Sequence, residues 1–266
     1  MTAKWDVGRL TERSPVPRRS PCSIANLFRG SIVRGSASRH TTSRMIHHDY
    51  LLRLIEEFAR ALSRIQELLS GHRPVEAQQA LDQQLQQLVA ADRQSVLRLS
   101  ATEILARILR KGTAHEVQTR TFFLAALLRE SGTLAETLGD DALARESRIK
   151  ALRVLLLVFE QTDPSESPRF IPSVDALLGQ LSSDSTPPDL HAQLMHHFER
   201  LGRYADAENA LFNLLDQTPG SPEFVAFGTA FYQRLESLGD TCLERGHLPR
   251  PELAPGLAEF RRRATA

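Results

Sequence analysis

The feature that most constrains this chain is a pair of short apolar repeats in residues 189–223, separated by Gly202. In each repeat, apolar side chains recur at steps of three and four residues, which places them on one face of a helix. The stretch therefore predicts two amphipathic helices that fold back on each other at Gly202 and end at Pro219 and Gly220. The first stripe consists of Leu190, Leu194, Phe198 and Leu201, and the second of Tyr204, Ala207, Leu211, Leu214 and Leu215.

The same periodicity recurs along most of the chain, whereas no alternating pattern of useful length predicts a strand. Leu, Ala, Gln, Glu and Arg dominate the composition, and these residues favour helices. We therefore expect an all-α fold in which antiparallel helical hairpins stack as a short solenoid. Besides the pair at 189–223, helices are expected at 46–69, from Pro74 to about residue 88, and at 100–109, 115–138, 140–161, 173–181, 223–245 and 252–263.

Capping residues and breaks divide this series of helices. Ser100 and Glu103 have the spacing of a capping box, and Asp140 is placed to cap the helix that follows it. Proline- and serine-rich breaks indicate a linker at 163–188 that contains one short helix. The expected organisation is N-terminal helical hairpins at 45–162, this linker, and then the 189–223 hairpin with the C-terminal helices, 189–266 in all. The apolar run 152–159 predicts that its helix is the most buried.

Residues 1–44 form a basic leader with nine basic and two acidic residues, and we expect this arm to be disordered because its composition cannot bury a core. Three interpretations remain open. The leader is a tail that binds anionic surfaces, an organelle transit peptide, or a segment upstream of a true start at Met45. The last is favoured because the amphipathic pattern begins directly after Met45.

The remaining 222 residues carry 24 basic and 30 acidic groups, which argues against nucleic acid as a partner of the folded part. No apolar run approaches the roughly 20 residues of a membrane span. We find no nucleophile elbow, phosphate loop, dinucleotide fingerprint or kinase signature, and therefore expect neither catalysis nor a cofactor. His191, His196 and His197 share one helix, but their spacing from His191 is five and six residues instead of four, so we expect solvated histidines and no metal site.

The 46–69 helix carries one apolar stripe and an opposite side of mixed charge. Such a helix can lie on a membrane surface or pack on a neighbouring helix, and the mixed charge favours packing.

The 189–223 stretch resembles a tetratricopeptide repeat, whose pattern spans about 34 residues. Apolar Leu211 takes the family's aromatic position, whereas His191 and Met195 depart from its usual Trp and Gly. Residues that match the pattern are Leu194, Phe198, Ala207 and Pro219.

Three further segments together resemble an uncharacterised bacterial family, a domain of unknown function with tetratricopeptide-like architecture, over residues 45 to about 263. They are MIHHDYLLRLIEEFARAL from Met45, GRYADAENALFNLL from Gly202 and ERGHLPRPELAPGLAEF from Glu244. The resemblance implies a helical fold and a bacterial cytoplasmic setting, and it supplies no activity, cofactor or catalytic residue.

Three functions follow as hypotheses, of which the third is an unrecognised enzyme that would need a concave pocket with clustered, perturbed ionisable groups. The first is a non-catalytic interaction or scaffold protein that binds a peptide or a partner helix in a helical groove. The tetratricopeptide resemblance implies that His196, Glu199 and Arg200 line this groove, although each is also typical of an ordinary solvated surface. The second is a peripheral membrane protein, or one that responds to a small molecule, which uses the 46–69 helix.

Overall fold

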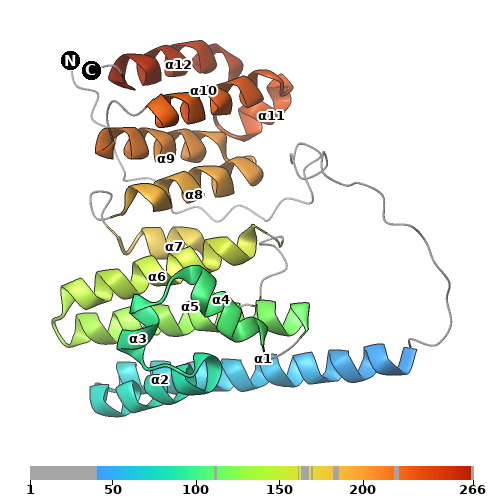
Figure 1. Ribbon diagram of the computed structural model, residues 1–266, viewed down its shortest axis with the longest axis vertical. Coiled ribbons are helices and arrows are strands. Elements are labelled where there is room, and N and C mark those ends of the chain that lie inside the picture. Colours follow the sequence, from blue (N-terminus) through green and yellow to red (C-terminus); the bar gives the residue numbers. More distant parts are fainter. Residues whose placement is uncertain are drawn as a thin grey trace.

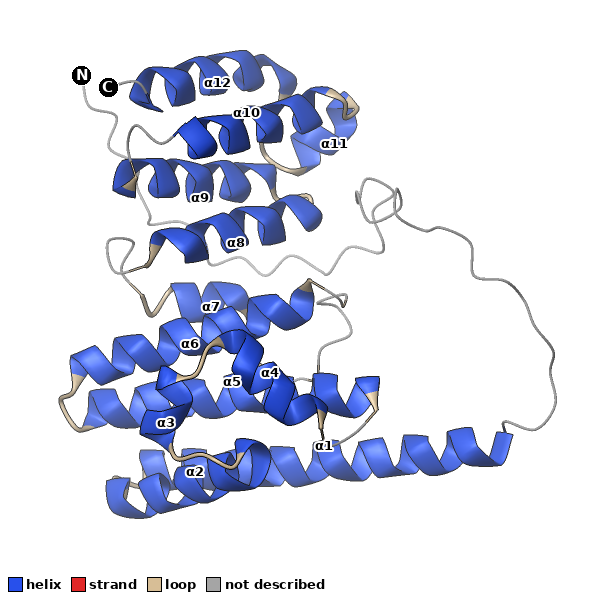
Figure 2. Ribbon diagram, viewed as in Figure 1, coloured by secondary structure: helices blue, strands red, loops and turns tan. Residues whose placement is uncertain are grey.

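The computed structural model describes residues 41–110, 113–160, 162, 168, 170–181, 186–218 and 222–264, with side chains from Tyr50 onward. Within these residues the chain forms twelve helices and no strand (Figure 2), which confirms the all-α expectation. The basic leader, apart from its last four residues, lies outside the described residues. Those four belong to the first helix, which therefore begins five residues earlier than the sequence predicts.

The helices, in chain order, are α1 Thr41–Ser70, α2 Pro74–Val89, α3 Arg93–Arg98, α4 Ala101–Leu109, α5 Ala114–Thr137, α6 Asp141–Phe159, α7 Val174–Leu178, α8 Pro188–Arg200, α9 Tyr204–Gln217, α10 Pro222–Glu236, α11 Asp240–Arg245 and α12 Arg250–Ala264. Figure 1 shows them as successive layers, with α1 and α2 at one end and α12 at the other. The pairs α5–α6 and α8–α9 pack most extensively. Buried apolar side chains form one connected cluster that extends from Leu62 in α1 to Ala264 in α12.

The α8–α9 hairpin buries the side chains that the sequence assigns to its interior. Leu194, Phe198 and Leu211 are all at most 5% exposed. Gly202, with φ of 72°, takes the left-handed conformation that lets the chain leave α8 and enter α9. Leu201 is the exception at 42% exposed, because it follows the last residue of α8 and no longer continues its buried face.

Two predicted caps are confirmed. Ser100 and Glu103 form a reciprocal capping box at the start of α4, and the Asp140 carboxylate accepts a hydrogen bond from the Leu143 amide of α6 at 3.0 Å.

Two local predictions are wrong, and one short helix was missed. The single helix expected at 223–245 is broken at Ser237, whose hydroxyl donates to the Arg234 carbonyl, and the chain restarts as α11 from extended Gly239. Helix α3 was not predicted, although Asp92 caps it by accepting from the Ser95 amide at 2.8 Å. The most continuously buried stretch lies in α5, residues 121–128, and not in α6, because α5 packs between α6 and both α1 and α2.

Helices α5 and α6 approach each other closely because small residues meet where they cross. A Cβ added to Gly132 would lie 3.0 Å from Arg148 Cγ and 3.1 Å from the Ala144 carbonyl oxygen. Ser131 and Ser147 are both fully buried there, with their hydroxyl oxygens 3.4 Å apart. The glycine thus leaves room for the arginine side chain to cross α5.

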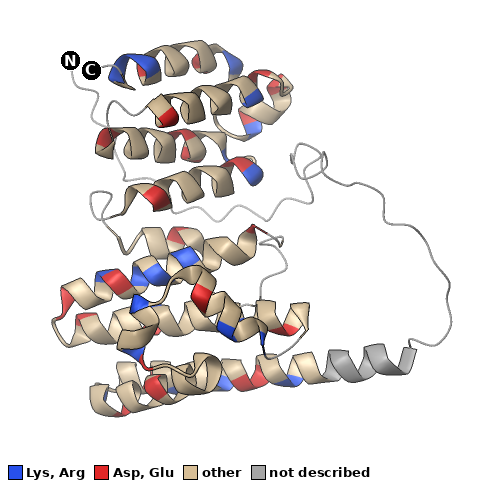
Figure 3. Cartoon of the chain, viewed as in Figure 1, with Lys and Arg blue, Asp and Glu red and all other residues tan. Residues whose placement is uncertain are grey.

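Helix α1 packs on α2 and α5 along its C-terminal part and extends past them at its N-terminal end (Figure 1). Its described outer side carries both acidic and basic residues (Figure 3), including Arg53, Glu56, Glu57 and Arg60. In the described part of the chain, no helix combines the length and the apolar character needed to span a bilayer.

Candidate functional site

His196 lies on an exposed face that α8 and α10 share, here called the α8–α10 face and defined by His196, Glu199, Phe227 and Arg234. The His196 side chain is 56% exposed. Its ring stands edge-on to that of Phe227, with ring centroids 5.1 Å apart and planes at 88°. This arrangement packs one side of the imidazole against Phe227 while more than half of the side chain stays exposed.

Glu199 lies beneath this pair, and its carboxylate is buried and fixed. The Arg234 guanidinium donates through Nε to Oε1 at 2.6 Å and through Nη2 to Oε2 at 2.8 Å. A two-pronged ion pair of this kind fixes both side chains and compensates for the burial of the carboxylate. It ties α8 to α10, so Glu199 supports the face instead of presenting its charge to a partner.

Arg200 points towards the preceding hairpin. Its Nη1 donates to the carbonyl oxygen of Phe159, the last residue of α6, where the unsatisfied carbonyls of a helix attract a cation. Of the three residues nominated from the sequence, the structure therefore brings His196 and Glu199 together, with Nδ1 and Oε2 4.0 Å apart, and directs Arg200 to α6.

The electrostatic surroundings of His196 favour a neutral ring. Partial burial lowers the pKa of His196, and the Glu199 carboxylate opposes this shift. A neutral imidazole offers one donor and one acceptor nitrogen. Beside it, α10 carries partly buried Phe224, Val225 and Phe227, so the α8–α10 face combines apolar contact area with a directional polar group.

The other two histidines of α8 are buried, contrary to the expectation that they are solvated. His191 is 4% exposed, and its Nε2 lies 3.3 Å from the Gln217 side-chain nitrogen. His197 is 7% exposed and stacks on Phe159 with ring centroids 5.5 Å apart. Burial, followed by the nearby guanidinium of Arg200, lowers the pKa of His197 to about 4. Within the described residues, no group of three or more His, Cys, Asp or Glu side chains is arranged to hold a metal ion.

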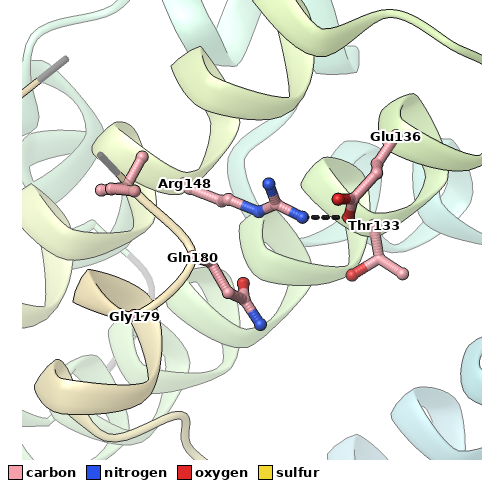
Figure 4. A pocket seen from close by; sticks show the side chains of 6 residues that line it. Thr133, Glu136, Arg148, Gly179 and Gln180 are labelled. Carbon is pink, nitrogen blue, oxygen red and sulfur yellow. Dashed lines mark hydrogen bonds and ion pairs between the residues drawn. The ribbon is translucent and has the colours of Figure 1, made fainter. Parts of the chain in front are cut away.

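A second candidate site, which the sequence analysis missed, is a cavity of about 570 Å³ between α5, α6 and the end of α7 (Figure 4). Its central side chain is Arg148, which is 8% exposed and forms an ion pair with Glu136. Two sequence signals pointed to it: Arg148 falls on the buried side of α6, and Gly132 interrupts a strong helical pattern. The cavity lining consists of Thr133, Glu136, Arg148, Gly179, Gln180 and Leu181.

Comparison with known proteins identifies a family and gives no information on the chemistry of either site. No curated protein and no solved structure matches the chain significantly. Residues 45–265 match the family of unknown function DUF6483, an extent close to the one expected from the sequence. This match spans most of the 266 residues, and the chain therefore belongs to the DUF6483 family.

Proposed function

We propose that this protein is a non-catalytic interaction protein that binds a peptide or a partner helix on its α8–α10 face. The observation that carries the proposal is the exposed His196 ring, held edge-on to Phe227 above the fixed Glu199–Arg234 ion pair. Because the supporting groups are already ordered, a partner would bind with little loss of side-chain entropy.

A bound helix or extended segment would place an apolar side chain against Phe227 and a polar group on the His196 nitrogens. Recognition of amphipathic helices commonly combines apolar anchors with a few directional polar contacts. We further infer that α8–α9 is a tetratricopeptide-like unit of a short solenoid. The Leu194, Ala207 and Leu211 side chains support this inference, because all three stand at positions of the repeat pattern and are buried. The setting that we propose is the cytoplasm of a bacterium.

The alternative function is docking of α1 on a lipid surface, and little of the apolar stripe of α1 is exposed for it. Leu54, Leu62, Ile65 and Leu68 of the α1 stripe are buried in the protein. Among residues 50–70 of α1, whose side chains the structure describes, the large exposed apolar residues are Tyr50 and Leu52, at 45% and 46% exposed. Flotation of the whole protein with anionic vesicles tests this alternative, and binding that is lost in a Tyr50→Ser, Leu52→Ser double variant would support it over the peptide-binding function.

Selection from a displayed library of helical peptides, followed by calorimetric titration of the enriched peptides, tests the proposed function. We expect His196→Ala and Phe227→Ala each to weaken binding about tenfold, the usual effect of losing one well-packed contact. His115→Ala is the matched control, because His115 is an exposed histidine at the start of α5. If the enriched peptides bind His196→Ala and Phe227→Ala as tightly as they bind the unaltered protein, the binding site is not the α8–α10 face. If no peptide is enriched, the proposed function is refuted.

A further inference from the structure

We propose that the cavity around Arg148 binds a small polar molecule that carries an oxyanion, a carboxylate or a phosphate, next to a hydroxyl or amino group. The proposal is independent of the α8–α10 face, because the cavity is built by α5, α6 and the residues that end α7. Figure 4 shows the Arg148 guanidinium extending across this space between the Gln180 and Glu136 side chains.

Arg148 is a buried cation, only 8% exposed. Moving an arginine out of water costs several kcal/mol unless its donors are paired. Within the described part of the chain, the one side chain to which its guanidinium bonds is Glu136, and that carboxylate side chain is 58% exposed. The Arg148 Nε is buried and has no hydrogen-bond partner among the residues that the structure describes. Arg148 thus differs from Arg234, whose guanidinium is bonded at two points to a buried carboxylate. Because the Nε of Arg148 is closed off from solvent, an oxyanion in the cavity would pair with the terminal nitrogens of the guanidinium, one of which bonds to Glu136.

Thr133, Glu136 and Gln180 supply the other polar side chains of the cavity. The Thr133 hydroxyl donates to the Arg129 carbonyl at 3.3 Å, which leaves its oxygen free to accept. Gln180 is exposed and brings an amide that both donates and accepts. With the Glu136 carboxylate as a further acceptor, the lining holds one cation and several groups that accept hydrogen bonds. That combination suits a ligand that has a donor beside its negative charge, such as a hydroxy acid, an amino acid or a sugar phosphate.

The cavity has the size of a small-molecule site, and its arginine is held in place. A volume of about 570 Å³ lies inside the range of roughly 300–1,000 Å³ that is typical of small-molecule sites. Gly132 fixes where the arginine lies, because a Cβ there would come within 3.0 Å of Arg148 Cγ and 3.4 Å of its Nε. The guanidinium is therefore held by the packing of α5 against α6 before any ligand arrives, which lowers the cost of binding.

Thermal-shift and calorimetric titrations of the full chain test the site with four probes at millimolar concentrations. Glycerol 3-phosphate and L-serine carry a hydroxyl or amino donor beside the oxyanion, whereas methyl phosphate and acetate carry the oxyanion without that neighbouring donor. We expect at least one of the first two probes to bind saturably. It should bind at least about tenfold more tightly than the donor-free phosphate or carboxylate with which it is paired, because the donor adds a well-made hydrogen bond. If glycerol 3-phosphate binds more tightly than L-serine, the oxyanion is a phosphate, and the reverse order identifies a carboxylate.

Two variants localise the binding. Arg148→Gln should abolish it, whereas Arg145→Gln, which removes an exposed arginine from the same helix, should leave it unchanged. Because loss of Arg148 removes the partner of Glu136 and can disturb folding, Gln180→Ala provides a milder test and should weaken binding about tenfold. The proposal is overturned if none of the four probes binds saturably, if the donor-free anions bind as tightly as the probes with donors, or if a folded Arg148→Gln variant binds like the unaltered protein.

Discussion

Protonation of His197 is expected to destabilise the protein as the pH falls below neutrality. This histidine is buried between α6 and α8, where it stacks on Phe159 and lies near the guanidinium groups of Arg200 and Arg203. Burial and these cations lower its pKa from 6.5 to about 4, and Asp175 opposes the shift only weakly. A histidine whose pKa is lowered by folding contributes stability above its unfolded pKa, and this contribution is lost as the pH falls from 6.5 towards 4.

The size of this effect follows from the two pKa values. Between about pH 7.5 and about pH 5, the linkage relation gives a loss of about 2 kcal/mol from His197 alone. For a chain of this size, such a loss corresponds to a fall in melting temperature of about 4–8 °C. A His197→Phe variant has no proton to gain and keeps an aromatic ring on Phe159, so its stability should fall less over the same interval.

Urea unfolding followed by circular dichroism, at both pH values and for both proteins, measures the difference. The comparison uses the change with pH within each protein, so a change in packing caused by the new ring cancels. His115→Phe serves as the control, because His115 is exposed and its replacement should leave the pH dependence of the unaltered protein intact. If the unaltered protein and His197→Phe lose the same free energy of unfolding between the two pH values, the buried neutral histidine is not the cause.

Further predictions concern the α8–α10 ion pair and the packing of α12. Arg234→Gln should destabilise the protein by about 1–3 kcal/mol, because it leaves the buried Glu199 carboxylate unpaired. Glu199→Gln should destabilise it less, because the new amide oxygen can still accept a hydrogen bond from Arg234. Urea unfolding at neutral pH measures both losses of free energy, and the reverse order would contradict this explanation. Gly228→Ala should cost about 1–3 kcal/mol, because its Cβ would lie 2.2 Å from Phe260 Cζ. Gly239→Ala is the matched control, since nothing lies within 4 Å of a Cβ at that position. Equal shifts in melting temperature for the two glycine variants would show that the Phe260 ring is not packed against Gly228.

The sequence predicts the helices well where one periodic stripe decides their burial, as in α8 and α9. Their interior side chains Leu194, Phe198 and Leu211 lie where the three- and four-residue steps place them. The sequence predicts less well where a local polar contact competes with periodicity. The Ser237 hydroxyl ends α10 in the middle of an apolar pattern, and Asp92 starts α3 in a segment without such a pattern.

The candidate sites were harder to predict, because their geometry depends on which polar side chains meet across helices. Helical spacing alone does not show that Glu199 pairs with Arg234, thirty-five positions later, or that Arg148 reaches the Glu136 carboxylate on the neighbouring helix. Tertiary packing decides whether a charged residue faces water. The sequence was therefore as consistent with a solvent-exposed Glu199 as with a Glu199 that lines a binding groove.

The polar residues of α8 largely serve to join the two ends of the protein. Arg200 donates to the end of α6, and Asp189 accepts from Arg153 of α6 at 2.9 Å. Just beyond α8, Arg203 bonds to both carboxylate oxygens of Asp175 in α7 at 2.9 Å. Reversing the charge of Arg200 would therefore disturb the α6–α8 junction before it changed any binding surface, since an anion would then face helix carbonyls. His196, whose ring contacts Phe227 and remains largely exposed, is the residue of α8 at which a loss of binding can be separated from a loss of folding.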